Sequence, residues 1–197
     1  MKVLGINGSP RKGGNTEILL NNALFGAKTK GASVECLTLN DLRFAPCQEC
    51  EKMPENGICL IKDSMGIVYE KVLAADAVIV ASPVFFGSVS AQLKAMIDRF
   101  QCVWLAQFEH GKKIFLKARP GAFICVEASA RGDFFDNSRA VVKNLFATIA
   151  VKYNYELLVT NLEKKGIVNQ FPDALEKAYR IGEDVVAVSS ASGKKNP

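Results

Sequence analysis

The chain has 197 residues, enough for one domain with a full hydrophobic core, and 49% hydrophobic and 23% charged residues are ordinary for a globular protein. The formal net charge is only +5, and no run of basic residues alternates with aromatic ones, which excludes a nucleic-acid-binding stripe. No apolar run approaches the ~20 residues that cross a bilayer, which excludes a transmembrane segment.

The first predicted strand, residues 3–6, leads into a loop at 8–16 with the composition of an anion site. A helical pattern begins at the end of the loop and continues to about residue 28, and N–H groups at a helix N-terminus bind phosphates. The loop lacks the lysine of a P-loop and the glycine spacing of a dinucleotide fingerprint, which favours a terminal monophosphate. An ordinary turn with a helix cap is the alternative. The candidate donors are Ser9, Arg11, Asn15 and Thr16.

A second strand is predicted at 34–39, and the long segment after it, 40–62, carries three of the six cysteines. Long insertions in compact domains are more often functional than accidental. Because Met1 leads almost at once into the first strand, we expect no signal peptide and a cytoplasmic location, where disulfide frameworks are rare. The cysteines of the insertion therefore indicate a metal, redox or core role. They are Cys47, Cys50 and Cys59.

The unbroken apolar run at 77–81 predicts a central strand that is covered on both faces. In the loop after it, at 82–90, a proline, two phenylalanines and a glycine offer a stiff, flat and closely approachable surface. Such a loop suits a planar ring, although both phenylalanines could equally belong to the core. A planar ring beside a monophosphate site indicates flavin mononucleotide (FMN).

The remaining elements alternate in the same way. Strands are predicted at 121–126 and 153–160, and helices at 88–100, 135–150 and 172–188. This pattern predicts an α/β fold with a doubly wound, five-stranded parallel sheet in a three-layer α/β/α arrangement. Ligands collect beyond the carboxyl ends of such strands, where the loops at 8–16, 82–90 and 127–136 are expected to meet. We predict one domain at 1–188 and a disordered tail at 189–197.

Two motifs carry a resemblance to a known family. Gly-Ser-Pro-Arg-x-x-Gly-Asn-Thr at 8–16 and Ser-Pro-Val-Phe-Phe-Gly-Ser-Val-Ser at 82–90 resemble those of NAD(P)H-dependent FMN reductases of flavodoxin-like fold. The cysteine insertion is similar to that of the iron–sulfur flavoprotein branch, and the resemblance runs over roughly residues 1–185. It implies FMN as cofactor, NAD(P)H as transient electron donor, and a homodimer or homotetramer.

The resemblance also assigns site residues. The FMN phosphate is expected to bind the four donors at 8–16 named above. The isoalloxazine ring is expected to contact Pro83, Val84, Phe85, Phe86 and Gly87. A third and less regular loop would add Ser129, Arg131 and Gly132.

The expected activity is hydride transfer from NAD(P)H through FMN to a flavin, quinone or similar small-molecule acceptor. This chemistry is centred on the flavin and needs no catalytic triad, which agrees with a single histidine, His110, in a polar stretch that predicts exposure. One alternative is an FMN electron-transfer protein acting between protein partners, although this basic chain lacks an evident acidic docking face. A protein dominated by its metal site and a redox-inactive nucleotide-binding module are further alternatives.

The cysteine insertion departs from the pattern of its branch. Four closely spaced cysteines hold a [4Fe–4S] cluster there, but Met53 stands where the third is expected, and a thioether replaces a thiolate poorly. Cys36 or Cys102 could complete the set, although we expect both, like Cys125, to be small core residues. We therefore predict no [4Fe–4S] cluster. The three cysteines of the insertion stay weak candidates for zinc or a labile cluster.

Overall fold

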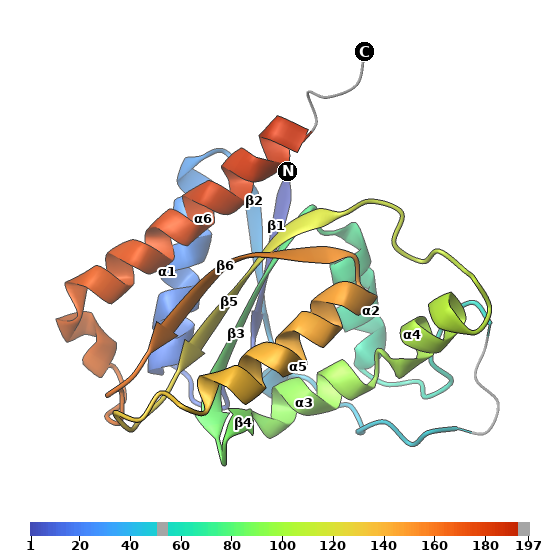
Figure 1. Cartoon of the computed structure of the whole chain (residues 1–197), viewed down its shortest axis with the longest axis horizontal. Helices are drawn as coiled ribbons and strands as arrows, with labels where there is room; N and C mark the ends of the chain where they lie inside the picture. The colour runs from blue at the N-terminus through green and yellow to red at the C-terminus, as the bar shows by residue number, and fades with distance from the viewer. Residues whose placement is uncertain (51–54, 193–197) are drawn as a thin grey trace.

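The computed structural model describes residues 1–50 and 55–192, with side chains through residue 188. Its sheet has five parallel strands in the order β2-β1-β3-β5-β6, and a short strand, β4, pairs antiparallel with the end of β3. The strands are β1 (Lys2–Asn7), β2 (Ser33–Thr38), β3 (Ala77–Phe85), β4 (Ser88–Val89), β5 (Arg119–Val126) and β6 (Val151–Val159). This order, with helices on both faces, confirms the predicted doubly wound α/β fold (Figure 1).

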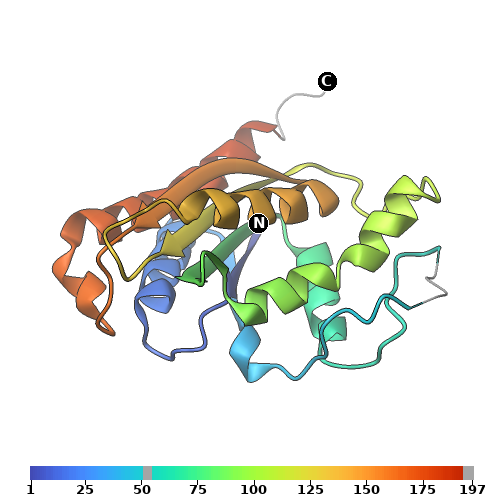
Figure 2. The same ribbon diagram turned by 60° about the horizontal axis from the view of Figure 1, so that its bottom comes forward.

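Helices cover both faces of the sheet. On one face α1 (Asn15–Thr29) and α6 (Pro172–Ser192) lie side by side, and on the other lie α2 (Met65–Ala74), α3 (Ala91–Asp98) and α5 (Phe135–Thr148) (Figures 1 and 2). The shorter α4 (Gln101–Phe108) follows α3, η1 (Leu39–Asp41) follows β2, and η2 (Ile167–Gln170) precedes α6. Within residues 1–50 and 55–192, no helix combines the length and the apolarity needed to cross a bilayer.

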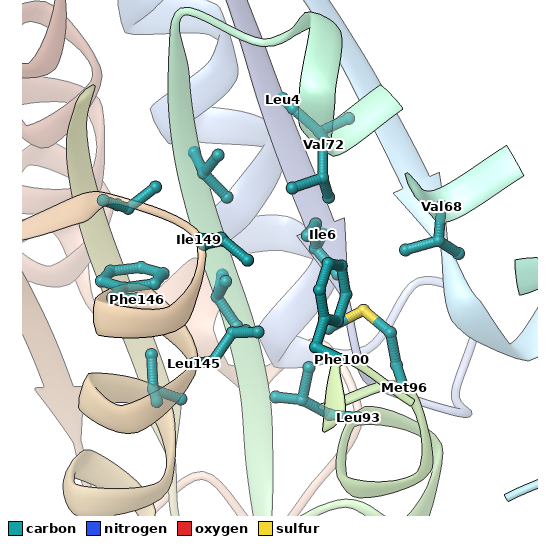
Figure 3. Packing of buried hydrophobic residues seen from close by; sticks show 14 of the residues in the cluster. Leu4, Ile6, Val68, Val72, Leu93, Met96, Phe100, Leu145, Phe146 and Ile149 are labelled. Atoms are coloured by element: carbon teal, nitrogen blue, oxygen red, sulfur yellow. The ribbon is translucent and has the colours of Figure 1, made fainter. Parts of the chain in front are cut away.

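Alternate residues of the strands pack into two apolar clusters, which explains why the strands form unbroken apolar runs. In β1, Val3 belongs to the cluster under α1 and α6, whereas Leu4 and Ile6 belong to the cluster under α2, α3 and α5. Figure 3 shows this second cluster, in which Ile6 of the sheet lies near Phe100 at the end of α3. Burial of both faces holds the carboxyl ends of the strands at one edge, where ligands bind in this architecture.

Two glycines allow α1 and α6 to pack closely. A Cβ added to Gly26 in α1 would lie 2.0 Å from the carbonyl oxygen of Tyr179 in α6. A Cβ added to Gly182 in α6 would lie 1.8 Å from the carbonyl oxygen of Ala23 in α1. Neither position has room for a side chain, so the backbones of the two helices are in direct contact there. This contact fixes the C-terminal half of α1 against α6.

The end of β3 differs from the prediction. The strand continues through Phe85, because Val84 and Phe85 pair with β4, so most of the segment predicted as a loop lies in a hairpin. The helix predicted at 88–100 accordingly begins at Ala91, where the Ser90 hydroxyl accepts from Leu93 N–H at 3.2 Å, and ends at Asp98.

Three further differences concern helices. Neither α2 nor α4 was predicted from the sequence. In addition, α6 runs to Ser192, so the first part of the predicted disordered tail is helical, and residues 193–197 lie outside the described residues.

Candidate functional site

A pocket of about 200 Å³ opens at the carboxyl ends of the strands and joins loops that are far apart in the sequence. It is lined by Ser9, Arg11, Gly14, Asn15 and Thr16 after β1, Pro83, Val84 and Phe85 at the end of β3, Val126 and Ala128 around the end of β5, and Leu162, Glu163 and Lys165 after β6. The structure thus brings the predicted phosphate residues and the first part of the predicted ring platform together.

The loop at 8–16 is shaped by short hydrogen bonds within and beneath it. Gly8 N–H donates to the Ala81 carbonyl at 2.8 Å, and Ser9 N–H donates to Asn7 Oδ1 at 3.0 Å. The Ser9 hydroxyl in turn accepts from Arg11 N–H at 3.2 Å. These bonds curl the loop around the start of α1 before any ligand binds.

The N-terminus of α1 is open to an anion. Its N-cap residue is Gly14, which offers no side-chain cap, and the preceding Gly13 has a left-handed φ of +64°. A Cβ on Gly14 would lie 3.0 Å from the Arg11 carbonyl oxygen, so a side chain at this position would crowd the loop. The first-turn N–H groups and the helix dipole favour a phosphate at this position, and the exposed Arg11 adds a cation at its rim.

Asn15 acts differently from the other predicted phosphate donors. Its Nδ2 donates to the carbonyls of Leu162 and Lys164, both at 2.9 Å, and its Oδ1 accepts from Val168 N–H at 3.2 Å. The side chain is therefore engaged by the segment after β6. Only the backbone N–H of Asn15 is left for a phosphate.

The predicted ring platform is a hairpin at the end of β3. Phe86 and Gly87 form its two-residue turn, with left-handed φ values of +48° and +75°. Such a turn matches the twist of the paired strands, but the left-handed conformation costs a bulky residue about 1–2 kcal/mol. The ring of Phe86 is fully exposed, and Phe85 is 40% exposed. Phe85 lines the pocket, whereas Phe86 and Gly87 are absent from its lining, so the hairpin gives the pocket an apolar edge through Phe85.

The third predicted loop reaches the pocket through Ala128, but its three predicted site residues do not line it. Ser129, Arg131 and Gly132 are absent from the lining: the Ser129 hydroxyl donates to Glu127, and Arg131 pairs with Asp133 at 2.6 Å. Gly132 occupies a turn with φ of +72°.

Support for the hairpin comes from the start of α5. Asn137 Nδ2 donates to the Gly87 carbonyl at 2.8 Å, and the Phe134 ring lies 3.1 Å from where a Cβ on Gly87 would be. The hairpin turn is therefore held by residues that the sequence analysis did not single out.

The segment after β6 forms a fourth wall of the pocket that was not predicted from the sequence. Leu162, Glu163 and Lys165 line the pocket beside the loop at 8–16. The strand at 153–160 was predicted, and the rule that ligands collect beyond parallel strands applies equally to the segment that follows it. No local motif marks these residues.

The cysteine insertion is anchored beside the core by a buried arginine. The Arg99 side chain is fully buried, and its guanidinium donates to both carboxylate oxygens of Asp63 and to the carbonyls of Ala45 and Ile61. Cys59 is also buried. These contacts fix the two ends of the insertion, on either side of the residues at 51–54 that lie outside the description.

The described cysteines do not lie together as the four thiolates of a cluster would. Among the described residues, no three His, Cys, Asp or Glu side chains gather in a way that could hold a metal ion, and Met53 lies outside them. Cys47 and Cys50 are half-buried. The absence of a [4Fe–4S] cluster therefore stays a prediction, which rests on the missing thiolate at position 53.

The remaining cysteines and the histidine have ordinary environments. Cys102 and Cys125 are buried as expected, and burial raises the pKa of the Cys125 thiol to about 12. Cys36 is exposed on β2, so the prediction of a core role was wrong for this residue. His110 is exposed, as predicted.

The pocket residues fit the two ends of FMN. An open helix N-terminus with a glycine cradle suits a terminal phosphate, and the Pro83 to Phe85 wall suits a flat apolar ring at the same edge of the sheet.

Comparisons with known proteins agree with this geometry. An iron-sulfur flavoprotein of Methanosarcina thermophila is 41% identical over 132 residues, which cover 67% of this chain and 66% of that protein. An iron-sulfur flavoprotein of Methanocaldococcus jannaschii is 39% identical over 132 residues, which cover 67% of this chain and 65% of that protein. The chain thus spans slightly less than two thirds of the length of these relatives.

The solved NAD(P)H:quinone oxidoreductase of Methanothermobacter marburgensis superposes with a TM-score of 0.70 at 17% identity, over 93% of this chain and 94% of that one, which shows a shared fold. The family model described as NADPH-dependent FMN reductase matches residues 1–152. That match takes in the loop at 8–16, the β3 hairpin and the support of the hairpin, and the chain belongs to the NADPH-dependent FMN reductase family, whose cofactor is FMN.

Proposed function

We propose that this protein is an FMN-dependent oxidoreductase that takes hydride from NAD(P)H and passes the electrons to a small-molecule acceptor such as a flavin or a quinone. The observation that carries the proposal is the pocket in which an open helix N-terminus and an apolar hairpin meet at one edge of the sheet. When bound, FMN supplies the redox chemistry, and the chain supplies binding and orientation.

The proposed roles of the residues follow from their positions. Ser9, Arg11 and the N–H groups of the first turn of α1 hold the phosphate. Pro83, Val84 and Phe85 provide a wall for the ring and exclude water from one side of it. Gly87, whose carbonyl is fixed by Asn137, keeps the hairpin turn at the mouth of the pocket, where NAD(P)H would bind transiently.

Steady-state kinetics with purified, FMN-loaded protein test the activity. We expect oxidation of NADPH or NADH with free flavin or a quinone as acceptor, followed by the loss of nicotinamide absorbance. An FMN-loaded protein that is reduced by a protein partner but never by NAD(P)H would instead be an electron carrier. Light scattering on the same preparation tests the predicted homodimer or homotetramer.

A titration of apoprotein tests the cofactor choice separately. FMN is expected to bind more tightly than FAD, because the loop at 8–16 has one anion site and lacks the glycine spacing of a dinucleotide fold. Equal or tighter binding of FAD would contradict the monophosphate assignment.

A further inference from the structure

We propose that Lys165, in the segment after β6, is a second cation for the phosphate of the cofactor, and that Asn15 is the positioning residue that holds it there. The proposal rests on the proposed function, because it adds a contact to the same pocket. The part of the chain that carries Lys165 lies beyond residue 152, where the match to the family model ends.

The first observation is the place of the lysine. Lys165 lines the pocket together with Ser9 and Arg11. Its Cε lies 3.5 Å, and its Nζ 3.8 Å, from where a Cβ on Gly13 would be, so the end of the side chain lies against the loop at 8–16. Because Gly13 has no side chain, the ammonium group can approach the backbone of the loop closely.

The second observation is charge. Among the described residues, neither Arg11 nor Lys165 pairs with a carboxylate, whereas the neighbouring Lys12 pairs with Asp41 at 3.3 Å. Glu163 also lines the pocket, so the charged side chains of the lining leave it a net positive charge. Two unpaired cations on separate loops are well placed to bind a dianionic phosphate between them.

The third observation is how the segment is held. All three hydrogen bonds of the Asn15 side chain go to backbone groups on either side of Lys165, at Leu162, Lys164 and Val168. Gly166, with φ of +76°, turns the chain directly after the lysine. The residue that opens α1 therefore also sets the backbone position of the second cation.

The test uses riboflavin as a flavin without a phosphate. Apoprotein is titrated with FMN and with riboflavin at low ionic strength, where an exposed cation is least screened. We expect Lys165→Gln to weaken FMN binding about tenfold and to leave riboflavin binding unchanged, the scale of one charge-assisted contact. Lys165→Arg is expected to restore most of the FMN affinity.

The matched control is Lys164→Gln, since Lys164 offers only its backbone carbonyl to Asn15 and its side chain does not line the pocket. It should bind both flavins like the wild type. For Asn15→Ala, the preference for FMN over riboflavin should fall, and adding Lys165→Gln should lower it little further, because both act through one contact.

Two results would overturn this proposal and leave the proposed function standing. In the first, Lys165→Gln binds FMN like the wild type; in the second, it loses affinity for FMN and for riboflavin equally. A wild-type protein that binds neither flavin would overturn the proposed function and this contact with it.

Discussion

The guanidinium of Arg99 donates to both carboxylate oxygens of Asp63, at 2.7 and 3.2 Å, and so binds the cysteine insertion to the end of α3. The arginine is fully buried, while Asp63 keeps 15% of its side chain exposed. Because a buried guanidinium without its counter-charge is costly, we expect this pair to keep the insertion packed on the domain.

Asp63→Asn is expected to lower the free energy of unfolding by about 3 kcal/mol, since it leaves the charge of Arg99 buried and uncompensated. Urea unfolding measures the loss. Asp98→Asn is the control, because Asp98 forms an exposed pair with Lys94 at 2.7 Å whose loss costs less than about 1 kcal/mol. Equal effects of the two variants would contradict the anchoring role of Arg99.

The same pair predicts a pH dependence. Desolvation opposes the shift, but hydrogen bonds from Arg99 and from the N–H groups of Met65 and Ala45 hold the pKa of Asp63 below its ordinary value. A carboxyl with a lowered pKa stabilises the fold fully above its unfolded value of about 4, and this contribution is lost as the pH falls through the folded pKa. The stability difference between wild type and Asp63→Asn should therefore shrink below about pH 4. A difference that stays constant down to acid unfolding would argue against the shift.

Gly182→Ala is expected to destabilise the protein by about 3 kcal/mol, because its Cβ would lie 1.8 Å from the Ala23 carbonyl oxygen and force α6 away from α1. Gly66→Ala on α2 is the matched control, with nothing within 4 Å of the new Cβ. It should stabilise its helix by about 0.5–1 kcal/mol. Thermal unfolding measures both, and shifts of the same sign would refute the packing argument.

Arg11→Ala is expected to weaken FMN binding by about 1.5–3 kcal/mol, the scale of a hydrogen bond to a charged group. Ser9→Ala should cost less, because the N–H groups of the first turn still surround the phosphate. Lys12→Ala is the control, since Lys12 lies outside the pocket and pairs with Asp41. Calorimetric titration of apoprotein gives the affinities. An unchanged FMN affinity for Arg11→Ala would show that the phosphate does not bind in this loop.

A [4Fe–4S] cluster contains about four iron atoms per chain. After anaerobic reconstitution with iron and sulfide, we expect an iron content far below this value, because Met53 replaces one thiolate. Iron and sulfide analysis with electron paramagnetic resonance measures the uptake. Met53→Cys is the converse test and should raise it. A reducible cluster at full stoichiometry in the wild type would show that a fourth ligand comes from elsewhere.

The fold could be predicted because its strands are marked by local pattern. The unbroken apolar run at 77–81 is one such mark, and β3 does lie there. The continuation through Phe85 was hidden, because Pro83 and Gly87 are typical of a loop, and only the pairing of Val84 with Val89 shows a hairpin. The missed α2 did carry a helical signal, with Met65, Val68 and Val72 buried on one face.

The phosphate end of the site was local enough to predict, because Ser9 and Arg11 stand in one short motif. Lys165 carries no such signal. Its place depends on hydrogen bonds from Asn15, a residue far away in the sequence, and single-sequence patterns contain no information about such contacts.

The hydrogen bond between Asn15 and Val168 spans 153 positions, so the pocket has an order of assembly. During synthesis, the strands up to β5 and the loop at 8–16 leave the ribosome well before the segment after β6 exists. A nascent chain can therefore shape the first phosphate loop early, but it can close the pocket only after the segment that follows β6 has been translated. We therefore expect tight cofactor capture to follow the synthesis of this segment, and a chain truncated before residue 160 should fail to retain FMN even if its sheet folds.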